Sequence, residues 1–169
     1  TLDKFEEASE IVKKVTLETK LVYSDYFSAQ TGNRVYLKPE NLQFTGAYKL
    51  RGAYYKMSTL TDEERAKGLI TASAGNHAQG VALAAAKNGI SSLICIPDSA
   101  PISKVEATRG YGAEVVLVPG VYDDAAAEAE RLTKEQGYTF AHPFNDPLVI
   151  AGQGTIGLEI LEQLPDVEQ

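Results

Sequence analysis

Two short segments of the chain hold the residue types that could do chemistry. One is Lys38 to Ala53, with the sequence KPENLQFTGAYKLRGA, and the other is Thr71 to Gly80, with the sequence TASAGNHAQG. The first contains Lys49, and a lysine amine can form a Schiff base with a carbonyl compound when its pKa is lowered. The second combines small residues with serine, asparagine and histidine side chains, which suits a loop that binds a carboxylate or a phosphate.

Lys49 is expected in the first turn of a helix. Pro39 and Gly46 bracket a loop, and the helical pattern begins near Ala47 or Tyr48. The positive end of the helix dipole disfavours an ammonium group there, so the pKa of Lys49 is expected to fall, as a Schiff-base amine requires. Most lysines at helix starts are simply exposed, and the residues alone leave this alternative open.

The second segment is expected at the carboxyl end of a strand, where ligands bind in open α/β sheets. The apolar run Leu69 to Ala72 predicts the strand, and a helix is predicted from about Asn76 to Asn88. Backbone N–H groups, the helix N-terminus and the side chains of Ser73, Asn76 and His77 would then face one anion. The alternative is structural: Ser73 or Asn76 caps the helix, and His77 lies on the surface.

The elements that must position these segments alternate between strand and helix from Leu69 onward. The strands are apolar on both faces and the helices are short, as in a parallel sheet covered by crossover helices. The expected fold class is therefore α/β, with a small parallel sheet in a three-layer αβα arrangement. Gly89, Gly112 and Gly137 fall near predicted helix ends, where a left-handed cap is commonly needed. The predicted strands are Val35 to Leu37, Leu69 to Ala72, Ser92 to Ile96 and Glu114 to Val118, and the predicted helices are about Phe5 to Val15, Ala47 onward, Asn76 to Asn88, Ser103 to Tyr111, Asp123 to Gln136 and Leu148 to Leu164.

A third motif, Gly152 to Gly157 with the sequence GQGTIG, matches the dinucleotide-binding fingerprint letter for letter. A true fingerprint needs a following helix, a second strand and an acidic residue about 20 positions later. Only 12 residues follow Gly157. The motif is therefore interpreted as small residues that let a helix pack closely on its neighbour, and no NAD site is expected.

Length, charge and apolar pattern exclude several classes of protein. The chain has 169 residues, 44% hydrophobic and 23% charged, which is typical of a folded domain. Its 16 basic and 23 acidic residues are interspersed and give a net charge of -7, so no nucleic-acid partner is expected. No apolar run approaches the roughly 20 residues of a membrane span, so no membrane partner is expected either. Cys95 is the single cysteine, which excludes an internal disulfide, predicts no metal site and is typical of an intracellular, cytoplasmic protein.

Together the two segments resemble the fold type II family of pyridoxal 5'-phosphate enzymes, and most closely its bacterial threonine and serine dehydratases. The likeness extends to Ala100 to Leu117 and His142 to Glu159, so it covers nearly the whole chain. It implies that residues 1–45 are the N-terminal part of a large domain, 46–145 a small α/β domain and 146–169 a returning helix of the large domain. The rest of the large domain would lie beyond Gln169, with the glycine-rich phosphate loop and the contact to the pyridine nitrogen.

The resemblance also implies a role for individual residues. Lys49 would hold pyridoxal 5'-phosphate as a Schiff base and then remove the α-proton of an amino-acid substrate. Tyr48 stands where the family usually has a phenylalanine packed on the ring, and Asn76 matches the asparagine that hydrogen-bonds the 3'-oxygen of the cofactor. The substrate carboxylate would be bound by Ser73, Gly75, Asn76 and His77.

The implied reaction is β-elimination. L-Threonine or L-serine would give 2-oxobutanoate or pyruvate with ammonia, in a homo-oligomer that is a dimer or a tetramer. The chain is expected to be an N-terminal fragment that is inactive alone. The alternatives that stay open are a serine racemase or another reaction of the fold type II family, and a catalytically silent α/β module. Ala74 stands where serine racemases carry a second serine, which favours dehydration over racemisation.

Overall fold

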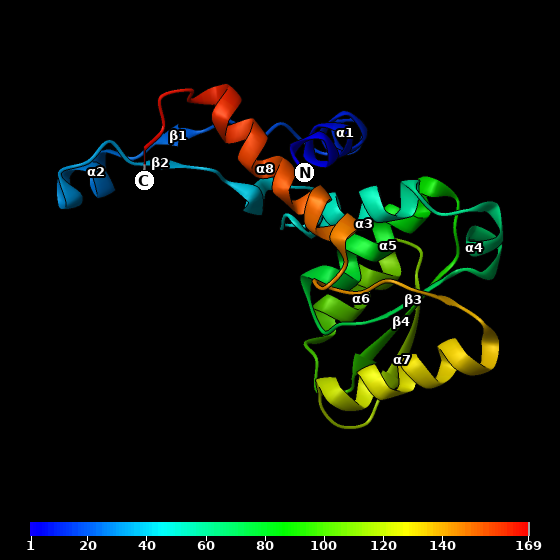
Figure 1. Ribbon diagram of the computed structural model, residues 1–169. Coiled ribbons are helices and arrows are strands. Elements are labelled where there is room, and N and C mark those ends of the chain that lie inside the picture. Colours follow the sequence, from blue (N-terminus) through cyan, green and yellow to red (C-terminus); the bar gives the residue numbers. More distant parts are fainter. Residues whose placement is uncertain (169) are drawn as a thin grey trace.

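A four-stranded parallel sheet forms the centre of the chain, and the computed structural model describes residues 1–168 around it (Figure 1). Its strands are β3 (Leu69–Ala72), β4 (Ser92–Pro97), β5 (Glu114–Val118) and β6 (Thr139–Phe140), in the order β5-β4-β3-β6. In the parallel register Ile70 pairs with Leu93, and Ile94 pairs with Val115. The predictions of β3, β4 and β5 are confirmed. Strand β6 was not predicted, because only two residues pair, both with β3.

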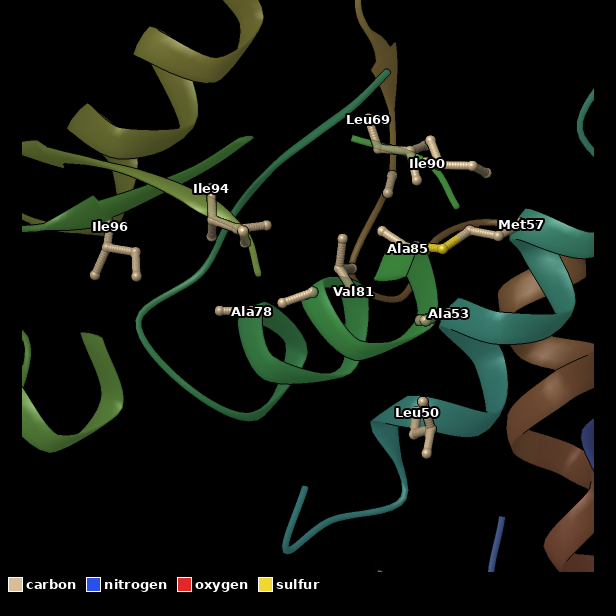
Figure 2. Close-up of a cluster of buried hydrophobic side chains, with 14 of the residues drawn as sticks. Leu50, Ala53, Met57, Leu69, Ala78, Val81, Ala85, Ile90, Ile94 and Ile96 are labelled. Carbon is tan, nitrogen blue, oxygen red and sulfur yellow. The ribbon is translucent and has the colours of Figure 1, made fainter. Parts of the chain in front are cut away.

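Helices cover both faces of this sheet. Helices α5 (Asn76–Asn88) and α6 (Ile102–Gly110) cover one face, and α7 (Tyr122–Gln136) covers the other (Figure 1). Successive side chains of a strand point to opposite faces. Accordingly, Leu93 and Cys95 of β4 pack in a cluster with α7, whereas Ile94 and Ile96 belong to the cluster around α5 shown in Figure 2. The expected three-layer αβα arrangement is confirmed.

A further layer of helices lies beyond α5. Helix α3 (Lys49–Ser58) packs on α5 and on α8 (Pro147–Gln163), and α1 (Leu2–Val12) packs on α8. Figure 2 shows Ala53 and Met57 of α3 directed toward α5, and Leu50 belongs to the same buried cluster. The opposite side of α3 faces α8 and α1, where Tyr55 is fully buried. Helix α3 is thus enclosed on two sides.

The GQGTIG motif lies inside α8, where a dinucleotide loop is impossible. A Cβ atom on Gly152 would lie 2.6 Å from the Cα atom of Gly52 in α3. A Cβ atom on Gly154 would overlap the ring of Phe5 in α1. These glycines therefore let two helices approach α8 closely. This confirms the interpretation of the motif as a site of close helix packing.

The N-terminal part of the chain includes an arm that extends away from the sheet (Figure 1). Strand β1 (Val22–Tyr23) pairs antiparallel with β2 (Tyr36–Leu37), and α2 (Asp25–Thr31) connects them. A single turn of 3-10 helix, η1 (Glu40–Leu42), follows β2 and leads toward α3. Several apolar side chains of the arm are exposed, among them Tyr26 at 69%. Of these elements only β2 was predicted, from the run Val35 to Leu37 that precedes Pro39.

The remaining boundaries agree with the pattern of caps. Gly89 and Gly137 have positive φ angles and are the C-cap residues of α5 and α7, whereas the C-cap of α6 is Tyr111 and Gly112 follows it. Helix α4 (Asp62–Lys67), which was not predicted, begins with a capping box between Thr61 and Glu64. Gln169, the last residue of the segment 146–169, lies outside the described residues. Within residues 1–168, no helix is long and apolar enough to cross a membrane.

Candidate active site

Lys49 is the first residue of α3, as predicted from the loop before it. Its Nζ atom donates a hydrogen bond to the carbonyl oxygen of Pro143 at 2.9 Å, and it lies 5.5 Å from the centroid of the Tyr48 ring. Partial burial lowers the pKa of Lys49. The pKa of Lys49 therefore shifts in the predicted direction. The cause is loss of hydration, whereas the sequence analysis expected the helix dipole to cause it.

The predicted anion loop connects β3 with α5. The backbone N–H of Gly75 donates to Ser73 Oγ at 3.2 Å, which holds the loop in a tight turn. Gly75 precedes α5, and within residues 1–168 no side chain caps this helix start. A Cβ atom on Gly75 would meet nothing within 4 Å, so the loop borders open space. The alternative in which Ser73 or Asn76 caps α5 is therefore wrong, and N–H groups at the start of the helix stay available to an anion.

Asn76 lies at the exposed edge of this loop. Its Oδ1 atom accepts a hydrogen bond from Lys104 Nζ at 3.4 Å, and Lys104 belongs to α6. Within residues 1–168, Lys49 makes no hydrogen bond to Asn76 or Ser73. The side chains of Lys49 and the loop are thus not joined directly.

His77 is buried, so the alternative of a surface histidine is wrong. Its side chain is only 4% exposed, and Nε2 lies 3.3 Å from the carbonyl oxygen of Ala141. Burial lowers the pKa of His77 to about 4; the hydrogen bond to Ala141 opposes this shift, and the charge of Lys49 adds to it. A neutral ring that donates from Nε2 keeps its lone pair on Nδ1. Within residues 1–168, no group donates to that nitrogen.

A segment of backbone before α8, residues 141–145, connects the loop with the lysine. The carbonyl of Ala141 accepts from Thr71 Oγ1 at 2.7 Å as well as from His77, and the carbonyl of Pro143 accepts from Lys49. Nδ1 of His142 accepts from the N–H of Asn145 at 2.8 Å and so stiffens the segment. The sequence analysis assigned no role to these residues, because backbone carbonyls leave no signal in the residue types.

The backbone of α3 lies directly against α5 at the same position. A Cβ atom on Gly80 would lie 3.0 Å from the carbonyl carbon of Lys49 and 3.1 Å from the nitrogen of Leu50. Only a glycine therefore allows α5 to approach this turn so closely. This contact brings the start of α3 beside the start of α5, which carries the anion loop.

Four buried charged side chains, Lys38, Glu40, Arg51 and Glu159, lie on the other side of α3. Sequence reasoning missed them, because Glu159 lies 108 positions from Arg51 and none of the four has a neighbour of opposite charge at helical spacing. The one available signal was Arg51 itself, a charged residue between Leu50 and Gly52 on a helix with an apolar face.

Comparisons with known proteins agree on one class of enzyme. The family model described as pyridoxal-phosphate dependent enzyme matches residues 12–168. An L-threonine ammonia-lyase of Thermotoga maritima is 54% identical over 99% of this chain, which spans 42% of that relative. An L-threonine dehydratase, catabolic TdcB, of Staphylococcus aureus N315 is 50% identical over 99% of this chain, which spans 49% of that relative.

Solved structures give the same result. The processed form of threonine deaminase isoform 2 from Solanum lycopersicum superposes with a TM-score of 0.92 at 42% identity, over 98% of this chain and 49% of that one. Maize serine racemase superposes with a TM-score of 0.94 at 38% identity, over 98% of this chain and 50% of that one. The chain spans less than half the length of the two curated relatives named above.

Proposed function

Because the chain belongs to the pyridoxal-phosphate dependent enzymes, we propose that it is the N-terminal part of a threonine/serine ammonia-lyase. The whole enzyme would convert L-threonine to 2-oxobutanoate and ammonia, and L-serine to pyruvate and ammonia. Two curated relatives that are about half identical to nearly the whole chain carry names of the threonine reaction. The family expected from the two sequence motifs is confirmed.

The residues present fit the cofactor of the family. A lysine amine whose pKa is lowered by burial is the group that can bond to an aldehyde carbon. Beside it lie a loop that borders open space at Gly75 and a buried, unsatisfied nitrogen, Nδ1 of His77, within the described residues. When bound, the cofactor supplies an aldehyde for a Schiff base with Lys49 and a ring that takes up negative charge from the substrate.

Lys49 then acts as the proton acceptor in this proposal. The amine can take a proton only while it is uncharged, and loss of hydration favours the uncharged form. The carbonyl of Pro143, 2.9 Å from Nζ, holds the amine at one place before the reaction. Tyr48 would lie against the ring of the cofactor, on the same side of the helix start as Nζ.

The loop of Ser73, Gly75, Asn76 and His77 binds and orients the substrate carboxylate in this proposal. The single observation that carries the proposal is the uncapped start of α5 at an open space, packed close to the start of α3 where the amine of Lys49 is partly buried. N–H groups at a helix start attract an anion, and the neutral ring of His77 fixes the loop through Ala141. Asn76 would contact the 3'-oxygen of the cofactor once it leaves Lys104.

The division into domains remains part of the proposal. Residues 1–45 and 146–169 would belong to a large domain that continues in the rest of the protein, and residues 46–145 would form the small domain. Packing of α1 on α8 supports the first pairing. A cytoplasmic location and a homo-oligomeric state stay predictions.

The decisive experiment uses the intact protein that contains this chain. With pyridoxal 5'-phosphate and L-threonine it should form 2-oxobutanoate, and borohydride reduction should leave the cofactor on Lys49, as detected by peptide mass spectrometry. The K49A variant should lose both signals, whereas K87A, which changes an exposed lysine of α5, should keep both. A K49A protein with normal turnover would overturn the proposal.

A second candidate reaction is racemisation of serine, because maize serine racemase has the same fold over 98% of the chain. Measuring D-serine and pyruvate from L-serine in one assay distinguishes the two reactions. We expect pyruvate to dominate, since Ala74 offers no hydroxyl at the position of the second serine of racemases.

A further inference from the structure

A buried cluster of four charged side chains lies on the far side of α3 from Lys49. It consists of Lys38, Glu40, Arg51 and Glu159, whose side chains are 7%, 11%, 0% and 8% exposed. Two positive and two negative groups make the cluster electrically balanced. Such an arrangement is costly to desolvate and is weak evidence for stability by itself. A role in geometry therefore has to be considered.

Arg51 is the centre of this cluster. Its Nε and Nη2 atoms donate to the two oxygens of Glu40, both at 2.8 Å. Its Nη1 and Nη2 atoms donate to the two oxygens of Glu159, at 2.6 and 3.0 Å. Nη1 also donates to Thr155 Oγ1 at 3.2 Å. These five hydrogen bonds match the five N–H donors of a guanidinium group, so the side chain has a single orientation.

The partners of Arg51 are themselves fixed. Lys38 Nζ contacts Glu159 Oε2 at 2.6 Å and also donates to the carbonyl of Thr19. The hydroxyl of Thr19 donates to Glu40 Oε1 at 2.6 Å. The cluster thus ties α3 to α8 and to the segment between α1 and η1. Arg51 is held by parts of the chain that lie far apart in sequence.

Lys49 and Arg51 share the first turn of α3. A separation of two residues rotates a helix by about 200°, so the two side chains leave the helix on nearly opposite sides. Tyr48 is the N-cap residue, and within residues 1–168 it makes no side-chain cap hydrogen bond. An uncapped first turn tends to fray. Arg51 is the residue of this turn with the strongest tether.

Close helix contacts add to this tether at the same turn. Gly80 of α5 fits against the carbonyl carbon of Lys49, and Gly152 of α8 fits against the carbonyl oxygen of Arg51, where a Cβ atom would lie 2.7 Å away. The turn can neither shift toward α5 nor toward α8. Rotation of the turn about the helix axis is what the hydrogen bonds of Arg51 prevent.

We infer that Arg51, held by Glu40 and Glu159, is a positioning residue that fixes the first turn of α3 so that the amine of Lys49 stays at the carbonyl of Pro143. The inference rests on the proposed function of Lys49. Reacting groups that are misplaced by about 1 Å can lose a hundredfold in rate, so a loosened turn should be visible in catalysis.

The test compares R51K with a matched variant, R65K, in the intact protein loaded with pyridoxal 5'-phosphate. Arg65 is partly buried, whereas Arg51 is fully buried, and it binds the other end of α3, where it donates to the carbonyls of Met57 and Leu60. R51K keeps the charge of the cluster and loses the paired hydrogen bonds. Its kcat for 2-oxobutanoate should fall about tenfold to a hundredfold, with KM changed less than about threefold. R65K should keep the wild-type kcat, even if it lowers Tm as much as R51K does.

A second readout does not depend on activity. In the cofactor-free protein, the rate at which an acylating reagent labels Lys49 across pH reports the pKa of its amine. R51K should move that pKa toward the ordinary lysine value, because a loosened turn lets water reach the amine. R65K should leave it unchanged. Equal labelling curves for wild type and R51K would overturn the inference.

The outcomes also separate this inference from the proposed function. A wild-type protein without cofactor on Lys49 contradicts the proposed function, and the labelling curves then decide on Arg51 alone. If R51K does not fold, the double variant R51M/E159Q, which leaves Lys38 and Glu40 as a balanced pair, takes its place. An R51M/E159Q protein with the wild-type labelling curve and kcat would refute the role of Arg51.

Discussion

The amine of Lys49 lies 2.9 Å from the carbonyl oxygen of Pro143, a residue 94 positions further along the chain. The same short segment, through Ala141, holds Thr71 and His77. A single stretch of backbone therefore fixes both the start of α3 and the start of α5. Substitutions at and around these two helix starts should therefore have distinct effects on substrate binding, on stability and on the products formed.

Protonation of His77 should make the protein sensitive to mild acid. Burial lowers its pKa from 6.5 to about 4 in the folded protein, so between these values the unfolded chain binds more protons. The free energy of unfolding should therefore fall as the pH is lowered from 6.5 to 4, by up to about 3 kcal/mol. Urea unfolding of the intact protein at several pH values measures this slope.

The H77N variant is the control for that slope, since asparagine does not titrate in this range. Its free energy of unfolding should depend less on pH between 4 and 6.5 than that of the wild type. Parallel curves for the two proteins would show that other groups cause the acid sensitivity.

Removing the hydroxyl of Ser73 should weaken substrate binding. Ser73 Oγ accepts the N–H of Gly75 and so keeps the loop tight at the open space. In S73A the loss of about 1 kcal/mol of hydrogen bonding should raise KM for L-threonine about fivefold. Steady-state kinetics on the intact enzyme, with cofactor saturation checked by absorbance, measure the change. An unchanged KM would remove Ser73 from the substrate site.

Two glycines of α8 should respond in opposite ways to alanine. A Cβ atom on Gly152 would lie 2.6 Å from backbone of α3, so G152A should destabilise the protein by about 1–3 kcal/mol. A Cβ atom on Gly157 would meet nothing within 4 Å, and G157A should stabilise the helix by about 0.5–1 kcal/mol. Chemical unfolding of both variants tests the close contact, and similar stabilities would contradict it.

Adding a hydroxyl at position 74 should change the outcome with serine. Ala74 is partly buried in the loop between β3 and α5, and the family resemblance implies a second serine at this position in serine racemases. A74S should raise the ratio of D-serine to pyruvate formed from L-serine, because a hydroxyl can return a proton to the opposite face of the α-carbon. Chiral chromatography with a pyruvate assay measures both products, and A74G, which adds no hydroxyl, should keep the original ratio.

The sequence predicted the sheet and its helices well, for an evident physical reason. Ile94 and Cys95 lie on opposite faces of β4 and are both buried, so the strand shows as a continuous apolar run between glycine and proline signals. The left-handed caps at Gly89 and Gly137 mark helix ends with equal clarity. Such local signals depend on neighbouring residues alone.

The rest of the site depends on contacts that no local pattern records. Pro143 contributes a carbonyl group, which any residue has, and the partners of Arg51 come from positions as distant as Glu159. The burial of His77 likewise depends on Ala141, which lies 64 residues away. The two sequence motifs indicated which residues would carry the chemistry. Only the folded chain shows which contacts hold those residues in place.

The pairing of Arg51 with Glu159 also has a consequence for synthesis on the ribosome. The two residues are 108 positions apart, which corresponds to about 5–20 s of translation. During that interval Arg51 has Glu40 as a partner but lacks the second carboxylate, and α3 lacks the helix that encloses it. The first turn of α3 can therefore reach its final form only after α8 has emerged, so the reactive lysine is completed long after it has itself been synthesised.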